Sequence, residues 1–321
     1  AKLSVGKITK HPANPLFCED KPWEKRFDNL YGNVIYDDKE KIYKIWYSPF
    51  IIDYSAKGMS LSKRQEKEYM APQDREMAIC YATSKNGIDW DKPELGLVDY
   101  NGSTDNNIVW RGTHGAGIYK DPYEKDPDLL YKMLLKLGES GEGLATSHSS
   151  DGIIWSKPAG IKLDGIMGDT HNNLLWDSNS GTYVGITRTW GEMGREVMRI
   201  ESNDFKTWKK DKVVMTGKNK IRQPYSMPVF FHAGVFLGLV AVHEQPPVDR
   251  VWTELAWSPD TKIWHRIDEG NPLIPCSDKI LDYDYGCVYS CANPIFLKNE
   301  IRLYYGGRDY LHYEWRTGNL S

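Results

Sequence analysis

The sequence lacks long apolar runs and basic clusters. No stretch approaches the roughly 18 apolar residues of a membrane-spanning helix, and no Lys/Arg-rich run with interleaved aromatic residues is present. The 41 Lys and Arg residues against 44 Asp and Glu give a net charge of −3. We therefore expect neither a membrane span nor a nucleic-acid partner. At 321 residues, with 26% charged residues, the chain is long enough for one large β domain or two ordinary ones.

Metal-binding and disulfide signatures are also scarce. The sequence has no CxxC motif, no His at zinc-finger spacing beside its cysteines, and no Asp-x-Asp-x-Asp loop, so we expect no metal and no cofactor. Its five cysteines favour buried free thiols, with one disulfide as the alternative. They are Cys18, Cys80, Cys276, Cys287 and Cys291. The first residues, Ala-Lys-Leu-Ser-Val, lack the apolar core of a signal peptide, and we expect a periplasmic or secreted protein in its mature form.

No amphipathic stretch exceeds about two helical turns, but one short phrase occurs four times. In each copy a Ser comes first, an Asn or Asp follows two residues later, and a Trp stands six residues after the Ser. Ser and Asp or Asn side chains can bond the backbone N–H groups of a turn, and the Trp can cover the seam to a neighbouring sheet. A repeat of about 50 residues with strand-like flanks is typical of propeller blades. The copies are Ser84–Trp90, Ser149–Trp155, Ser202–Trp208 and Ser258–Trp264.

Alternating apolar patterns separated by polar turns predict hairpins in five consecutive units. We predict a single all-β domain over residues 1–321. It would be a five-bladed β-propeller with four-stranded antiparallel blades around a central funnel. Asn14-Pro-Leu16 echoes Asn271-Pro-Leu273, so the N-terminal segment is expected to close the last blade, which includes a strand near 312–315. The polar insert 53–74 is typical of a functional lid. The predicted blades are 26–95, 106–160, 165–212, 220–270 and 280–321, the last closed by 1–20.

The strand ends Lys44-Ile-Trp-Tyr47 and Arg302-Leu-Tyr-Tyr305, together with the Ser-to-Trp corners, carry a family resemblance. The chain resembles the five-bladed β-propeller glycoside hydrolases of families 43, 32, 62 and 117 and their relatives. This resemblance implies cleavage of a glycosidic bond in a carbohydrate substrate. It also implies acidic residues at the starts of the innermost strands, around the mouth of the funnel.

Asp28, nine residues before the turn residue Asp37, resembles the blade-one aspartate that serves these families as nucleophile or base. Asp169 lies eight residues before the turn residue Asp177 and is our candidate acid or transition-state stabiliser, facing Asp28 over the pocket. Glu244 is the alternative acid. Either Asp28 or Asp169 could instead only bond the backbone of its loop. A non-catalytic carbohydrate-binding propeller is therefore the alternative function.

Unit two contains Lys120-Asp121-Pro122, which is similar to the Arg-Asp-Pro motif of family 32. Because Asp121 stands where Asp37 and Asp177 stand, we interpret it as a turn residue on the outer rim of a hairpin, away from the pocket, and place His114 in the funnel. The glycines around His114 suit either close approach to a ligand or a crowded axis. His114 or His171 is a third candidate for the acid. The remaining predicted sugar contacts are planar or aromatic groups, namely Arg188, Trp190, Arg222, Gln223, Tyr225, His243, Tyr289, Asn293 and Arg308.

Overall fold

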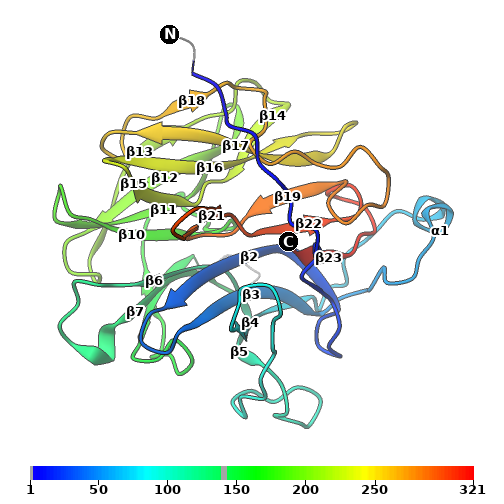
Figure 1. Ribbon diagram of the computed structural model, residues 1–321, viewed down its shortest axis with the longest axis horizontal. Helices are drawn as coiled ribbons and strands as arrows, with labels where there is room; N and C mark the ends of the chain where they lie inside the picture. Colours follow the sequence, from blue (N-terminus) through cyan, green and yellow to red (C-terminus); the bar gives the residue numbers. More distant parts are fainter. Residues whose placement is uncertain (1–2, 139–142) are drawn as a thin grey trace. The chain divides into compact units, whose positions relative to one another are not determined.

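The computed structural model describes residues 3–138 and 143–321, with the exception of the side chain of Asp28. The described chain is almost entirely β-structure (Figure 1). Helical structure within it is limited to α1 (Leu61–Glu66) and the 3-10 turn η1 (Pro127–Leu129). The prediction of an all-β protein is therefore confirmed. No helix of the described residues has the length and apolar character needed to cross a membrane.

Residue contacts divide the chain into two compact units, which we describe separately. The central unit comprises Gly112–Val242 and Glu254–Asn271, with a few residues from the N-terminal end. The terminal unit comprises Gly6–Arg111, His243–Thr253 and Pro272–Ser321.

The central unit contains two four-stranded antiparallel sheets in which each strand pairs with the next along the chain. The first sheet consists of β6 (Thr113–Lys120), β7 (Tyr131–Leu137), β8 (Leu144–Ser149) and β9 (Ala159–Ile161). The second consists of β10 (Asn173–Asp177), β11 (Thr182–Gly191), β12 (Gly194–Ser202) and β13 (Trp208–Met215). In a third group, β14 and β15 both pair with β16, which pairs with β17, and β17 pairs with β18. Its bounds are β14 (Arg222–Ser226), β15 (Val229–His232), β16 (Val235–Glu244), β17 (Arg250–Ser258) and β18 (His265–Ile267).

The terminal unit contains one further sheet of four strands in chain order, with β2 (Arg26–Asp37), β3 (Ile42–Ile52), β4 (Glu76–Ser84) and β5 (Ile108–Arg111). A second row has the order β19 (Cys287–Ser290), β22 (Tyr305–Arg308), β23 (Gly318–Leu320) and β1 (Phe17–Cys18). β1 pairs antiparallel with β23, so the N-terminal segment adds an edge strand to this row. At the other end of the row, β19 pairs in parallel with β17 through Cys287 and Val251. A separate hairpin is formed by β20 (Ile295–Phe296) and β21 (Ile301–Arg302).

The repeated Ser-to-Trp phrase forms a hydrogen-bonded corner, as predicted. In the second copy the Ser149 hydroxyl accepts from the backbone N–H groups of Asp151 and Gly152, and the Asp151 carboxylate accepts from the next two N–H groups. Trp155 Nε1 then donates to the carbonyl of Gly152 at 2.9 Å. Because each corner satisfies its own backbone, it can end one strand and start the next without support from another sheet.

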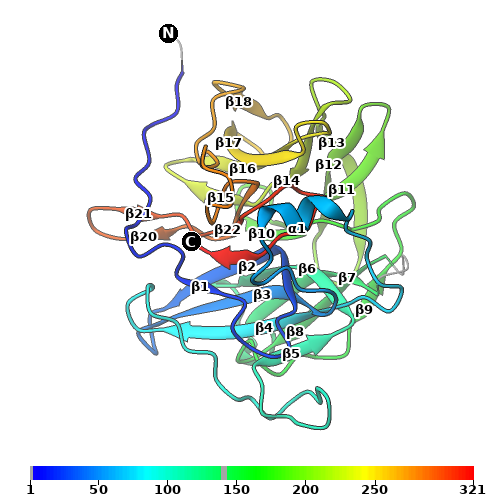
Figure 2. The same ribbon diagram turned by 90° about the vertical axis from the view of Figure 1, so that its right-hand side faces the viewer.

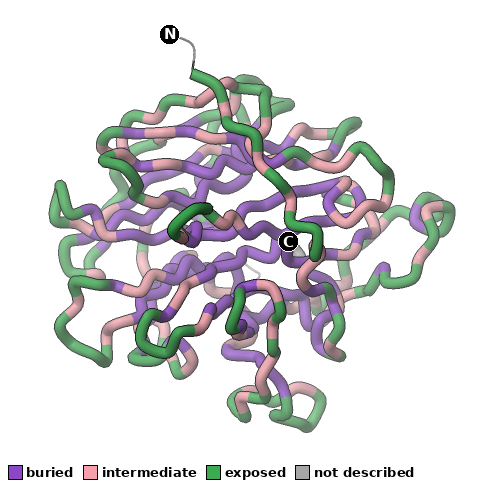
Figure 3. Tube along the Cα trace, in the orientation of Figure 1, coloured by how far each residue is buried: buried purple, intermediate pink, exposed green. Residues whose placement is uncertain are grey.

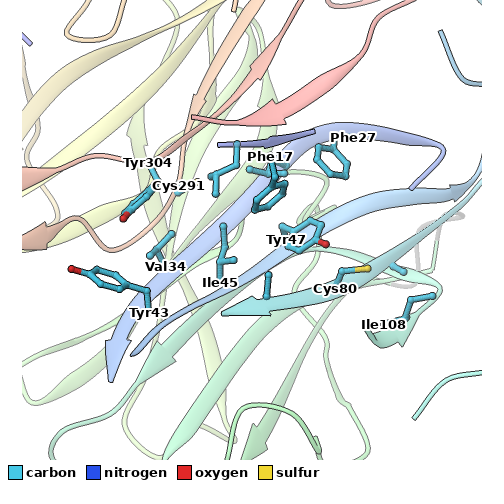
Figure 4. Close-up of a cluster of buried hydrophobic side chains, with 14 of the residues drawn as sticks. Phe17, Phe27, Val34, Tyr43, Ile45, Tyr47, Cys80, Ile108, Cys291 and Tyr304 are labelled. Carbon is cyan, nitrogen blue, oxygen red and sulfur yellow. The ribbon is translucent and has the colours of Figure 1, made fainter. Parts of the chain in front are cut away.

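Trp208, from the third corner, lies in an apolar core between two neighbouring sheets of the central unit. It packs with Leu134 and Leu144 of the first sheet and with Leu174 and Ile200 of the second. In the terminal unit a second core joins Phe17, Phe27, Tyr47 and Tyr304, among others (Figure 4). Burial follows the strands, and the connecting turns are mostly exposed (Figure 3).

Two details of the prediction are wrong. The segment 312–315 is a turn and not a strand, because side chains bind its backbone in place of a neighbouring strand: Asp249 Oδ2 accepts from Tyr313 N at 2.7 Å. The strand expected there is β23, a few residues later. Asp121 does occupy a turn, as predicted, but it is buried and not at an outer rim, since it accepts from Tyr183 Oη at 2.7 Å and lies 3.3 Å from Lys132 Nζ. The number of blades and their closure around a funnel remain predictions.

Candidate functional site

The central unit brings His114 and Asp169 into contact. His114 is the second residue of β6 and is buried, whereas Asp169 lies in the segment that leads into β10, with 52% of its side chain exposed. His114 Nε2 lies 3.0 Å from Asp169 Oδ1. Residues far apart in the sequence therefore present an exposed carboxylate supported by a buried imidazole.

Two glycines permit this close approach of β6 to the segment before β10. A Cβ atom on Gly115 would lie 1.9 Å from the carbonyl oxygen of Thr170, and one on Gly117 would lie 1.6 Å from that of Asn172. The N–H of Asn172 also donates to the carbonyl of Gly115 at 2.9 Å. Any larger residue would force the two segments apart, and with them the imidazole and the carboxylate. In this structure the two glycines therefore allow a close contact between two backbone segments.

Arg188 on β11 is the second partner of the carboxylate. Its Nη1 lies 3.4 Å from Asp169 Oδ2, and its Nη2 donates to the carbonyl of Tyr225 at 2.6 Å. The guanidinium carbon also lies 4.3 Å from the centroid of the Tyr225 ring. Arg188 is only 2% exposed, so these contacts hold its position on the buried side of the exposed Asp169 carboxylate.

The carboxyl of Asp169 is held in its ionised form. Burial by itself would raise its pKa, but the hydrogen bond with His114 and the positive charges of Arg188 and Lys136 outweigh burial and hold the pKa well below its usual range. Such a group accepts hydrogen bonds and stabilises positive charge, but it carries no proton to donate near neutral pH. The ionised state argues against Asp169 as a general acid and fits a base, a nucleophile or a transition-state stabiliser.

Two aromatic rings and another arginine extend this cluster. The guanidinium carbon of Arg195 lies 5.0 Å from the Trp190 ring and 5.1 Å from the Tyr225 ring, and Nη1 donates to Gln223 Oε1 at 3.0 Å. Trp190 is 53% exposed. Arg195 was not a sequence candidate, although it is the cross-strand partner of Trp190 in the β11–β12 hairpin, so strand pairing would have located it. The Asp169 cluster comprises His114, Asp169, Arg188, Trp190, Arg195, Gln223 and Tyr225.

Two further candidates of the central unit, His171 and Arg222, are not part of the Asp169 cluster. His171 is 1% exposed, and burial lowers its pKa to about 3, so its ring is neutral near pH 7. A histidine that does not take up a proton cannot serve as the general acid. Arg222 is exposed at the start of β14.

In the terminal unit, three candidates meet around a histidine that the sequence did not single out. His243, Tyr289 and Arg308 are buried at the ends of, or within, β16, β19 and β22. His312 Nδ1 lies 2.9 Å from Tyr289 Oη and 3.1 Å from Arg308 Nη1, and its ring centroid is 4.4 Å from that of His243. Arg308 Nη2 also donates to Asn29 Oδ1.

Asp249 fixes this second cluster. His243 Nε2 lies 3.0 Å from Asp249 Oδ1, and the backbone N–H of His312 donates to the Asp249 carbonyl at 3.0 Å. All three residues are buried. Asp249 and His312 lie in irregular loops, which explains why strand periodicity did not predict them. This second cluster holds the backbone of two loops in place, and its carboxylate, that of Asp249, is buried.

The other candidates of the terminal unit have less defined surroundings. Asp28 lies within β2, but its side chain is outside the described residues, so its pairing with Asp169 stays a prediction. Glu244 is partly buried at the end of β16, and Asn293 follows β19 with a φ of 62°. All five cysteines are free thiols, as predicted, but only three of them are buried, since Cys18 is exposed and Cys276 is partly buried. Among residues 3–138 and 143–321, no group of three or more His, Cys, Asp or Glu side chains could hold a metal ion.

Comparison with known proteins identifies the fold. No family model matches the sequence, and no curated protein matches it. A β-1,2-mannobiose phosphorylase from Listeria innocua, in complex with β-1,2-mannobiose, matches with a TM-score of 0.66 and 14% identity, over 97% of this chain and 95% of that one. An N-acetylgalactosamine deacetylase from F. plautii, in complex with blood group B trisaccharide, matches with a TM-score of 0.62 and 13% identity, over 99% and 94%.

A family GH43 β-1,3-galactosidase with bound galactodeoxynojirimycin matches with a TM-score of 0.54 and 10% identity, over 95% of this chain and 94% of that one. These three proteins differ in activity, and identities this low establish the fold and not the reaction. The chain shares its fold with these three proteins.

Proposed function

We propose that this protein is a carbohydrate-active enzyme that cleaves a glycosidic bond, built as a five-bladed propeller. The observation that carries the proposal is the Asp169 carboxylate, which is exposed to solvent yet held ionised by His114 and Arg188. Glycosidic cleavage needs one such carboxylate, because positive charge develops at the anomeric carbon in the transition state.

The neighbouring side chains suit a sugar. Trp190 exposes half of its ring system, and aromatic faces stack on the C–H surfaces of pyranose rings. Arg188 and Arg195 place planar donors beside the same carboxylate and rings, and such donors bind vicinal hydroxyls or a carboxylate. The complexes of similarly folded proteins with a mannobiose and a blood group trisaccharide agree with a carbohydrate substrate for this chain.

In the proposed hydrolysis, water adds to the anomeric carbon, the bond to the leaving oxygen breaks, and that oxygen takes a proton from a general acid. Asp169 would stabilise the transition state or act as the base. Asp28 would be its partner, and Glu244 the acid, because the pKa of Asp169 leaves it without a proton to give. We also propose that the enzyme acts in the periplasm or outside the cell, which cell fractionation would test.

The experiment is a screen of aryl glycosides and of plant and algal oligosaccharides, each with and without inorganic phosphate. Release of free sugar without phosphate supports hydrolysis. Release of a sugar phosphate only when phosphate is present would replace hydrolysis with phosphorolysis. Binding without any turnover would favour the non-catalytic alternative. Asp169→Asn should lower the turnover that is found by about 10²–10⁴-fold, and Asp164→Asn, which changes an exposed carboxylate five residues earlier, should not lower it.

A further inference from the structure

The insert 53–74 of the terminal unit is anchored by two buried arginines. Arg26 of β2 lies 2.6 Å from Asp53 at the start of the insert, with both side chains almost completely buried. The guanidinium carbon of Arg26 also lies 4.4 Å from the ring centroid of Tyr69, whose hydroxyl donates to Asp53 at 2.7 Å. Asp53 and Tyr69, which lie near the two ends of the insert, therefore both contact Arg26 of β2.

The second arginine is on the insert itself. Arg64 of α1 is 4% exposed and forms two parallel hydrogen bonds with the carboxylate of Asp309, both 2.8 Å long. Trp315 Nε1 donates a hydrogen bond to the carbonyl of Lys67, on the insert, at 2.8 Å. A bidentate Arg–carboxylate pair fixes orientation as well as distance. Figure 2 shows α1 at the surface, facing the viewer.

These anchors hold three aromatic side chains, Tyr54, Tyr69 and Trp315, which we call the aromatic ridge. The Trp315 ring centroid lies 5.2 Å from that of Tyr69, edge to face, and 6.2 Å from that of Tyr54. Tyr54 is 52% exposed and Trp315 is partly exposed. The ridge thus presents ring surface that the core does not use, in an orientation fixed before any ligand arrives.

We propose that the aromatic ridge is a saccharide-binding surface that stacks on a sugar ring of an oligosaccharide or polysaccharide. Tyr and Trp suit this role because each combines an apolar ring face with a polar group. Because the anchors already order these side chains, little conformational entropy is lost when a sugar binds to them. The ridge shares no residue with the Asp169 cluster. This proposal takes only the class of ligand, a carbohydrate, from the proposed function.

The surroundings of the ridge favour a sugar over a macromolecular partner. Its neighbours along the insert are mostly exposed polar residues such as Ser55, Lys57 and Glu68, with the exposed Met70 as an apolar exception, so the apolar surface is small. A stable protein interface needs about 800 Å² on each side. Residues 53–74 contain four basic and four acidic side chains, a balance that does not suit a nucleic-acid backbone.

The test is affinity electrophoresis of the full chain in gels that contain xylan, mannan, laminarin or pectin. We expect at least one polysaccharide to retard the wild type and Tyr54→Ala to weaken that binding by about two- to tenfold, the usual range for loss of one aromatic contact. Tyr123→Ala is the matched control, because Tyr123 is 63% exposed in the central unit and should leave retardation unchanged. Thermal melting would verify that both variants are folded.

A second variant tests the anchor. Arg64→Lys keeps the charge but loses the two-pronged geometry, so it should also weaken retardation while Tyr54 is still present. No retardation of the wild type in any gel, or equal retardation of wild type and Tyr54→Ala, would overturn the inference. Because the readout is binding, retardation without turnover would sink the proposed function alone, and turnover of short aryl glycosides without retardation would sink this inference alone.

Discussion

Glu19 should make this protein lose stability as the pH rises through neutrality. The residue is 5% exposed, and its Oε1 accepts hydrogen bonds from the backbone N–H groups of Phe27 at 2.6 Å and Gly318 at 2.9 Å. Burial raises the pKa of Glu19 to about 8, with the two hydrogen bonds opposing the rise and the charges of Asp309 and Glu24 adding to it. The folded chain therefore keeps a proton that the unfolded chain gives up near pH 4.5.

The sign and size of the effect follow from proton linkage. A raised pKa in the folded state means that the contribution to stability is complete below the unfolded pKa and is lost as the pH rises through the folded pKa. Within that window the free energy of unfolding falls by up to about 1.4 kcal/mol per pH unit. From about 4.5 to about 8 the total is on the order of 5 kcal/mol at most.

Glu19→Gln isolates this contribution, because the amide keeps a carbonyl acceptor for both N–H groups and cannot ionise. We expect urea unfolding, followed by tryptophan fluorescence, to give similar midpoints for the two proteins near pH 5 and a clear advantage for Glu19→Gln near pH 9. Asp38→Asn, which changes an exposed turn carboxylate, is the control. A difference between wild type and Glu19→Gln that does not change with pH would refute the reasoning.

Four further outcomes are expected. Asp169→Asn and Asp28→Asn should each lower turnover by about 10²–10⁴-fold in steady-state assays; normal turnover in both variants would move the active site elsewhere. Because the pKa of Asp169 is lowered, its contribution to stability should be present above about pH 4 and fade below it, which pH-dependent melting of the wild type against Asp169→Asn would measure. Gly117→Ala should be destabilised by several kcal/mol or fail to fold, since its Cβ would lie 1.6 Å from the Asn172 carbonyl oxygen; an unchanged melting temperature would contradict this packing. Ellman's reagent should react readily only with Cys18 in the native protein, the sole exposed thiol, and with all five after denaturation.

The sequence was sufficient to predict the elements that depend on local interactions. The Ser149–Trp155 corner closes on its own backbone, and the hairpin of β10 and β11 turns at a predicted polar loop, so neither needs a distant partner. The free thiols and the pairing of the N-terminal segment with the last sheet were also predicted. The prediction of a strand near 312–315 was wrong because that segment depends on a distant partner: the carboxylate of Asp249, from another loop, binds its backbone.

The candidate site was predictable only in part. Counting back from hairpin turns selected Asp169 and His114, and the end of the following strand selected Arg188. Their contact depends on Gly115 and Gly117, which let two backbones approach closely, and a sequence read alone leaves such glycines open to several interpretations.

The sequence by itself determined the β-class and the repeated corners, since these follow from hydrogen bonds and periodicity within a few dozen residues. Only the tertiary structure decided the charge state of Asp169 and the anchoring of the insert by Arg64. Both depend on burial and on side chains tens to hundreds of positions away. The physical reason is that a pKa or an ion pair is set by three-dimensional neighbours and by the local exclusion of water, and these exist only once the chain has folded.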